Sequence, residues 1–144
     1  MIKSEELMLG NILQDGKGRL CIVDKIFKYG FSAPAINSAV TTVNPAHSGI
    51  PFTPEILTEW CGFELCKPCV NFPAGFNKMP YYAKNGILLF FNEGDLSKFL
   101  FAKADQRFGY YSVVESAWHD KLHELQCFYY WNSGKQQLAI KIPK

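Results

Sequence analysis

The C-terminal stretch from Trp118 to Ile142 constrains the fold most, because a helix pattern runs there through a turn into a strand pattern. Four apolar side chains recur at spacings of four, three and four, which places them on one face of a predicted helix: Trp118, Leu122, Leu125 and Tyr129. From Cys127 to Trp131 every residue is apolar or aromatic, so these turns should be buried on most sides. Such a helix needs a core to cover.

The end of this helix is marked by Asn-Ser-Gly at residues 132–134, because Gly134 accepts the left-handed conformation that ends many helices. Leu138, Ile140 and Ile142 then alternate with polar or small residues. This alternation predicts a half-buried strand after the helix.

Two hairpins are indicated by turn residues between strand-like segments. The first joins residues 7–13 to residues 20–26 through Asp-Gly-Lys-Gly at 15–18. The second joins Tyr81–Lys84 to Ile87–Asn92 through Asn-Gly, which supplies the two positive φ angles of a tight turn.

The remaining segments give weaker signals. Residues 28–49 are predicted to be irregular, with one strand over residues 39–43, and residues 63–80 are predicted to be a loop because they hold three prolines and two glycines. Strands are predicted over residues 96–103 and 110–115.

A second, shorter helix is predicted before Cys61. Thr53 can cap its first turn, Pro54 suits the first helical position, and Gly62 ends the helix. The sum of these elements is an α+β fold: an antiparallel sheet built from hairpins with two helices, the C-terminal helix packed on the sheet. The 144 residues fit one domain, residues 1–144, with an N-terminal β-hairpin subdomain over residues 1–45.

Composition excludes several classes of protein. A hydrophobic fraction of 48% argues against disorder, and the longest apolar run, Ile87 to Phe91, is too short to span a bilayer. The formal net charge is only +2 and the lysines are scattered, which argues against nucleic acid as a partner. The first residues lack the apolar core of a signal peptide, and five cysteines fit a reducing compartment, so we expect a cytoplasmic protein without a membrane segment.

Three stretches resemble an uncharacterised family of small proteins from gut bacteria and phage-related regions: Leu-Met-Leu-Gly-Asn at 7–11, Ile-Pro-Phe-Thr-Pro-Glu at 50–55, and His-Glu-Leu-Gln at 123–126. The family is marked by a Leu-x-x-Gly-Asn start, an Ile-Pro-x-Thr helix entrance and a His-x-Leu-Gln helix. Cys127 stands where the family usually has Asn. The resemblance implies fold and bacterial host context, and it implies no activity.

The cysteines form the one cluster with metal-ligand spacing. Cys61, Cys66 and Cys69 could share a zinc ion if His119, His123 or Cys127 supplied the fourth ligand, or could form a redox dithiol. His119 and His123 are four apart and should project from one helix face together with Cys127. Only one cysteine pair is present and no helix follows it, so ordinary thiols and packed histidines are the preferred interpretation, with no metal and no cofactor.

Aromatic residues line the predicted strands: Phe99 and Phe101 are two residues apart, and three pairs are adjacent, namely Tyr81 and Tyr82, Phe90 and Phe91, and Tyr110 and Tyr111. One member of each pair should be covered by a helix or loop, or else be exposed for binding. The leading hypothesis is a non-catalytic binding or accessory protein with a protein partner, in a phage- or mobile-element-related context. The alternatives are a metal-binding or thiol-dependent enzyme that uses the three-cysteine cluster, and a weak single-stranded nucleic-acid binder that uses the N-terminal hairpin region.

Overall fold

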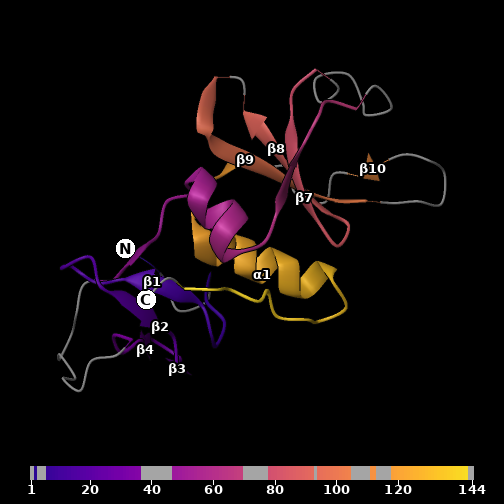
Figure 1. Ribbon diagram of the computed structural model, residues 1–144. Coiled ribbons are helices and arrows are strands. Elements are labelled where there is room, and N and C mark those ends of the chain that lie inside the picture. The colour runs from indigo at the N-terminus through magenta and orange to yellow at the C-terminus, as the bar shows by residue number, and fades with distance from the viewer. Residues whose placement is uncertain are drawn as a thin grey trace. The chain divides into compact units, whose positions relative to one another are not determined.

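The structure is a computed structural model, and it describes residue 2 and residues 6–36, 47–69, 78–92, 94–104, 111–112 and 118–142. These residues form antiparallel sheets of hairpins and two helices, which is the predicted α+β fold (Figure 1). No helix in these ranges is long and apolar enough to cross a membrane.

The chain divides into two compact units. The N-terminal unit comprises Met1–Pro51 and Lys121–Cys127, and the C-terminal unit comprises Phe52–Asp120 and Phe128–Lys144. Residues 122–127 of helix α1 (Leu122–Asn132) therefore belong to the N-terminal unit, and residues 128–132 belong to the C-terminal unit.

Two small sheets lie in the N-terminal unit. Strand β1 (Ile12–Gln14) pairs antiparallel with β2 (Leu20–Ile22) on one side and with β5 (Ser48–Gly49) on the other. Strands β3 (Lys25–Phe27) and β4 (Gly30–Ser32) form the second sheet. The first predicted hairpin is therefore confirmed in β1 and β2, but its second half continues as a separate strand, β3.

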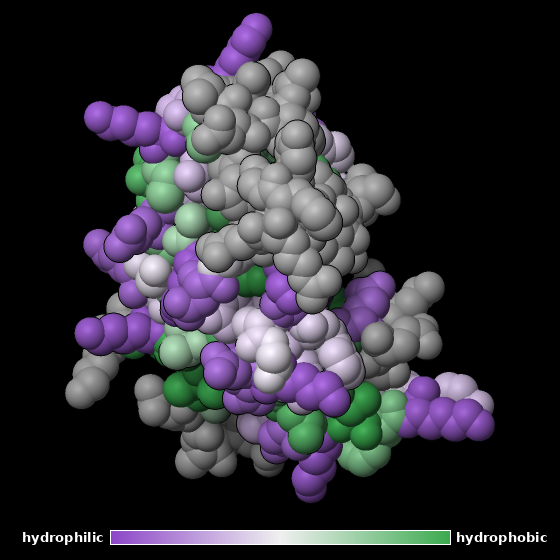
Figure 2. Space-filling model, turned by 90° about the vertical axis from the view of Figure 1, so that its right-hand side faces the viewer, coloured by the Kyte–Doolittle hydropathy of each residue, from purple (hydrophilic) through white to green (hydrophobic). Residues whose placement is uncertain are grey.

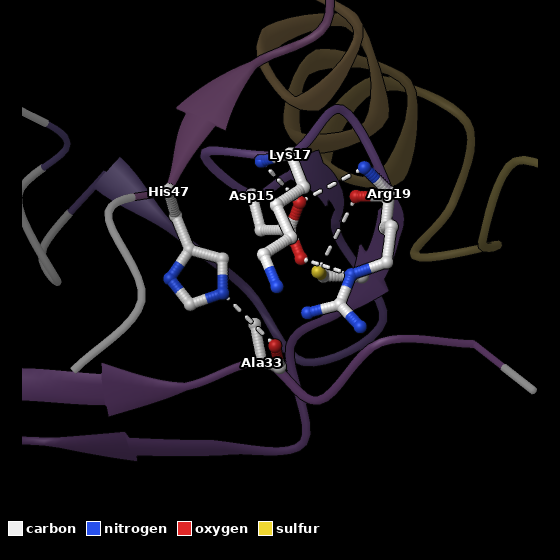
Figure 3. A network of polar contacts seen from close by, with 6 residues as sticks. Asp15, Lys17, Arg19, Ala33 and His47 are labelled. Carbon is white, nitrogen blue, oxygen red and sulfur yellow. Dashed lines mark hydrogen bonds and ion pairs between the residues drawn. The ribbon is translucent and has the colours of Figure 1, made fainter. Parts of the chain in front are cut away.

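The turn between β1 and β2 is organised by Asp15. Its carboxylate accepts hydrogen bonds from the backbone N–H groups of Lys17 and Arg19, both at 2.9 Å, and from the Arg19 guanidinium at 2.7 Å (Figure 3). The bond from the Arg19 N–H, together with these further contacts, lowers the pKa of Asp15 below its ordinary value. Below the turn, five buried side chains form the core of the unit: Leu7, Leu13, Cys21, Val23 and Ala33.

One larger sheet lies in the C-terminal unit, with strands in the order β10, β9, β8, β7, β6, and β11 also pairs with β9. Its strands are β6 (Glu64–Cys66), β7 (Tyr81–Lys84), β8 (Ile87–Asn92), β9 (Asp95–Ala104), β10 (Tyr111–Ser112) and β11 (Trp118–His119). The predicted turn at Asn85 and Gly86 is confirmed, with φ values of 50° and 82°. The strand predicted over residues 96–103 is confirmed as β9.

The shorter helix contains the π-helical segment η2 (Ile56–Trp60). The Thr53 hydroxyl accepts a hydrogen bond from the Ile56 N–H at 3.2 Å, so the predicted cap is present. The Cys61 N–H donates to the Ile56 carbonyl at 3.0 Å, and Gly62, with φ +77°, ends the helix as predicted.

Helix α1 contacts a strand in each unit. In the N-terminal unit the Gln126 side chain accepts a hydrogen bond from the Ile12 N–H of β1 at 2.8 Å and donates one to the Gly10 carbonyl at 3.1 Å. In the C-terminal unit the Phe128 ring lies 5.3 Å from the Phe101 ring of β9. Leu125 is fully buried, as predicted.

The start of the C-terminal helix was predicted wrongly. Helix α1 begins at Leu122, because Trp118 and His119 pair with Leu100 and Phe99 of β9 instead of continuing the helix. Sheet pairing here overrides the helical spacing, and Trp118 is 41% exposed.

Burial of the last helical turns was predicted correctly only in part. Phe128 and Tyr129 are buried, but Trp131 is 64% exposed and lies under the Lys135 ammonium, 5.9 Å from its ring centroid. The residues that follow do not form the predicted strand. Leu138 is buried, yet the backbone of this segment bonds to a helix carbonyl, with the Lys141 N–H donating to Trp60.

Other differences concern segments predicted as irregular. Strand β6 lies in the predicted loop over residues 63–80, and β4 lies in the predicted irregular segment over residues 28–49. The strand predicted over residues 110–115 is described only as β10, and the strand predicted over residues 39–43 lies outside the described residues.

Candidate functional site

The cysteine cluster lies in the C-terminal unit. Cys61 is fully buried, and burial raises the pKa of its thiol to about 12, so the thiol is protonated and unreactive at neutral pH. Cys66 and Cys69 are partly buried free thiols. Within the described ranges no group of three or more His, Cys, Asp or Glu side chains is arranged to hold a metal ion. The cluster therefore gains no support as a metal or thiol site.

The two C-terminal histidines do not share a helix face, contrary to the prediction. His119 lies on β11 and its ring stacks on Phe101 at 4.6 Å. His123 lies on α1, nearly fully buried, with its ring against Gly49 of β5. A Cβ added to Gly49 would lie 2.7 Å from Cε1 of His123, so this contact requires glycine. Each histidine packs beside a sheet, which is the role that the preferred interpretation gave them.

A pocket of about 540 Å³ lies in the N-terminal unit, a volume in the range of small-molecule sites. Its described lining includes His47, His123, Lys121, Glu6 and Glu124. The His47 Nε2 lies 2.9 Å from the Ala33 carbonyl oxygen, which can only accept, so Nε2 carries the proton (Figure 3). Because the lining carries both signs of charge, it selects no single class of ligand.

The residues that carry the family resemblance have structural roles in the N-terminal unit. The Asn11 side chain is fully buried and accepts a hydrogen bond from the Met8 N–H at 2.8 Å. Gly10, with φ +88°, offers its carbonyl to Gln126, and the Ile50 carbonyl accepts from the Leu122 N–H at 2.8 Å. These motif residues join the first turns of α1 to β1 and to the segment after β5.

The paired aromatic residues of the C-terminal sheet are covered. Four of them are at most 4% exposed: Tyr82, Phe90, Phe99 and Phe101. Tyr81 and Phe91 are partly buried. Tyr110 and the side chain of Tyr111 lie outside the described residues. The expectation that these aromatic side chains are covered is confirmed for Tyr82, Phe90, Phe99 and Phe101.

Three exposed apolar side chains lie close together in sequence on the β3–β4 hairpin, residues 25–32, which we call the arm. Tyr29 at its turn is 89% exposed and Phe27 is 57% exposed. Phe27 pairs across the hairpin with Gly30, which has no side chain to cover the ring. Ile26, on the other face, is 38% exposed. The general surface mixes apolar and hydrophilic side chains, as Figure 2 shows for one face.

The arm is anchored in the core of its unit. The hydrogen-bond pattern of the hairpin continues beyond β3 and β4, because the Asp24 N–H donates to Ser32 and the Ile22 N–H donates to Pro34. Val23 and Ala33 at this end are buried. The base of the arm is therefore held by backbone hydrogen bonds and buried side chains.

The arm also carries positive charge. Lys25 and Lys28 are exposed, and the Lys28 ammonium lies 5.3 Å from the centroid of the Tyr29 ring. The sequence analysis missed this surface because it treated residues 28–49 as irregular. The available signal was the segment Lys-Ile-Phe-Lys-Tyr-Gly-Phe at 25–31, in which apolar residues flank a lysine-containing turn.

Comparison with known proteins adds no identity: no family model, curated protein or solved structure matches the chain.

Proposed function

We propose that this chain is a non-catalytic binding or accessory protein and that it recognises a protein partner through the arm. The observation that carries the proposal is the exposure of Tyr29 and Phe27 at the end of a hairpin whose base is buried. Exposed aromatic side chains are enriched at the centres of protein interfaces, where they fill pockets of the partner. Tyr29, at 89%, is the most exposed of the large apolar side chains in the described part of the chain.

The setting of this function is also part of the proposal. The family resemblance supports a bacterial host and a phage- or mobile-element-related role, and the number of cysteines supports a cytoplasmic location. An enzyme built on Cys61, Cys66 and Cys69 ranks lower, because the described residues supply no metal-binding group and Cys61 is fully buried. Nucleic-acid binding ranks lower because the net charge is only +2.

Site-specific photo-crosslinking tests the proposal. A benzoylphenylalanine residue would replace Tyr29 in the full chain, expressed in the source organism, and would be activated by light. The matched control places the same residue at Leu96 of β9, which is 60% exposed but lies outside the arm. We expect a protein adduct from position 29 that is absent from position 96.

A second variant makes the test specific. Phe27→Ser in the position-29 protein removes the neighbouring aromatic ring and should reduce the yield of the adduct. If position 29 gives no protein adduct, or if both positions give the same adducts, the arm is not a recognition surface and the proposal is wrong.

A further inference from the structure

We infer that the pocket of the N-terminal unit binds a small aliphatic amine, with an ammonium group of the ligand held at Glu6. This site does not use the exposed side chains of the arm, so it goes beyond the proposed function. The pocket, of about 540 Å³, is lined from three segments: the residues before β1, strand β5 with His47 before it, and the start of α1. All of these segments belong to the N-terminal unit.

The pocket is negatively charged, although the chain as a whole has a formal net charge of +2. Its described lining contains two carboxylates, Glu6 and Glu124, and one ammonium group, Lys121, with the histidines counted as neutral. A concave site with an excess of one sign of charge attracts the opposite sign. The excess of carboxylates therefore favours a cation as the ligand.

The groups of the lining that remain available lead to the same class of ligand. Lys121, His123 and Glu124 each interact with other groups of the chain. Glu6 is exposed, and within the described ranges no ion pair or hydrogen bond engages its carboxylate. The mixed signs of the whole lining select no ligand by themselves, but the available carboxylate selects a positively charged hydrogen-bond donor.

Two further groups that can accept a hydrogen bond come from His47 and Ser48. Because Nε2 of His47 donates to the Ala33 carbonyl, Nδ1 carries no proton and is an acceptor, on the edge of the ring turned away from Ala33 (Figure 3). The Ser48 hydroxyl is exposed and has no hydrogen-bond partner among the residues that the structure describes. An ammonium group has three donors and no acceptor, so it complements this set.

The arrangement fits an extended organic cation better than a metal ion. Glu6, Glu124, His47 and His123 line one pocket, yet in the described part of the chain no three such groups converge to hold a metal ion. A cation that contacts separated acceptors must itself be extended. Ile2, which also lines the pocket, provides apolar contact for the aliphatic chain of the ligand.

Isothermal titration of the full chain with diaminobutane tests the inference, and we expect saturable binding of one molecule per chain. Glu6→Gln removes the negative charge and keeps the length of the side chain, so the dissociation constant should rise about tenfold. Glu55→Gln is the matched control. Glu55 is also exposed but lies in the C-terminal unit, so its substitution should leave the dissociation constant unchanged. Circular dichroism would show that both variants are folded.

Succinate provides a control ligand, because it has as many carbon atoms as diaminobutane but carries carboxylates instead of ammonium groups, and we expect it not to bind. The inference is wrong if diaminobutane does not bind at millimolar concentration, if the two variants change its dissociation constant equally, or if succinate binds instead. Stoichiometric zinc binding that Glu6→Gln abolishes would replace the amine by a metal ion. Crosslinking at position 29 tests the arm separately, so either proposal can fail without the other.

Discussion

Two hairpins of this protein, β3–β4 and β7–β8, have the same construction but differ in burial. Each has two antiparallel strands joined by a two-residue turn. In β7–β8, the first four residues of β8 are all buried, and Phe90 pairs with Tyr81 at a ring distance of 5.9 Å. In β3–β4 every residue of β3 is exposed, and Phe27 pairs with Gly30.

The difference shows that an apolar residue in a strand can lie either in the core or on the surface. Both hairpins place phenylalanine in a strand, and the cross-strand partner and the covering elements decide its exposure. A hairpin covered on both sides contributes to stability, whereas one that is left open is available for recognition. The predictions below measure this difference, from the largest effect to the smallest.

Phe90→Ala should destabilise the protein by about 3–5 kcal/mol, the usual cost of removing a fully buried aromatic side chain. Phe90 is 3% exposed and belongs to a buried cluster with Leu88, Leu100 and Ala102. Chemical denaturation of the variant and the wild type measures the change. A loss below about 1 kcal/mol would mean that the cluster collapses around the gap or that this face of β8 is not core.

Substitution of the glycine at or beside each hairpin turn should change the free energy of unfolding by different amounts. Gly86→Ala should cost about 1–2 kcal/mol, because Gly86 has φ +82° and a side chain is strained in that conformation even though the space around it is open. Gly30→Ala is the matched control. Gly30 has no positive φ and also faces open space, so its substitution should change the free energy of unfolding by no more than about 0.5 kcal/mol. Equal costs at both glycines would contradict the conformational argument.

The dependence of stability on alkaline pH provides a third comparison, because it reports on the buried Cys61 thiol. The Cys61 carbonyl accepts a hydrogen bond from Lys84 of β7 at 2.6 Å, and burial raises the pKa of the Cys61 thiol from 9.0 to about 12. Below pH 9 the thiol is protonated in both states. Between pH 9 and 12 it ionises in the unfolded chain first, so the folded state loses roughly 1.4 kcal/mol per pH unit.

Cys61→Ala isolates this contribution from the other groups that titrate in the same range. The variant starts from a lower stability, because a buried side chain is truncated, but its free energy of unfolding should fall less steeply above pH 9 than that of the wild type. Parallel pH profiles would show that the thiol is not buried in the folded protein.

Local signals predicted the elements whose conformation is set by their own residues. The Asn-Gly turn at Asn85 and Gly86, the Thr53 cap and the glycines that end both helices all appear as expected, because a positive φ or a cap is a property of a few neighbouring residues. The buried Leu125 followed from helical spacing.

Elements that depend on distant partners were predicted less well. Trp118 and His119 have a helical spacing to α1, but β9 provides hydrogen-bond partners that make them a strand. The segment at 25–31 indicates a hairpin, but the exposure of Phe27 and Tyr29 depends on which distant elements pack against them, and among the described residues these side chains stay exposed. The cysteines at 61, 66 and 69 are close in sequence, yet no metal-binding group forms among the described residues.

The smallest expected change in stability is also the most informative about function. Phe27→Ala makes the same substitution as Phe90→Ala, but the ring is 57% exposed and faces a glycine. Its removal should shift the free energy of unfolding by no more than about 0.5 kcal/mol. The yield of the protein adduct formed from benzoylphenylalanine at position 29 should nevertheless fall, because the ring belongs to the exposed aromatic surface of the arm. A variant as destabilised as Phe90→Ala would show that the ring is buried in the folded chain, and an unchanged adduct yield would remove Phe27 from the recognition surface.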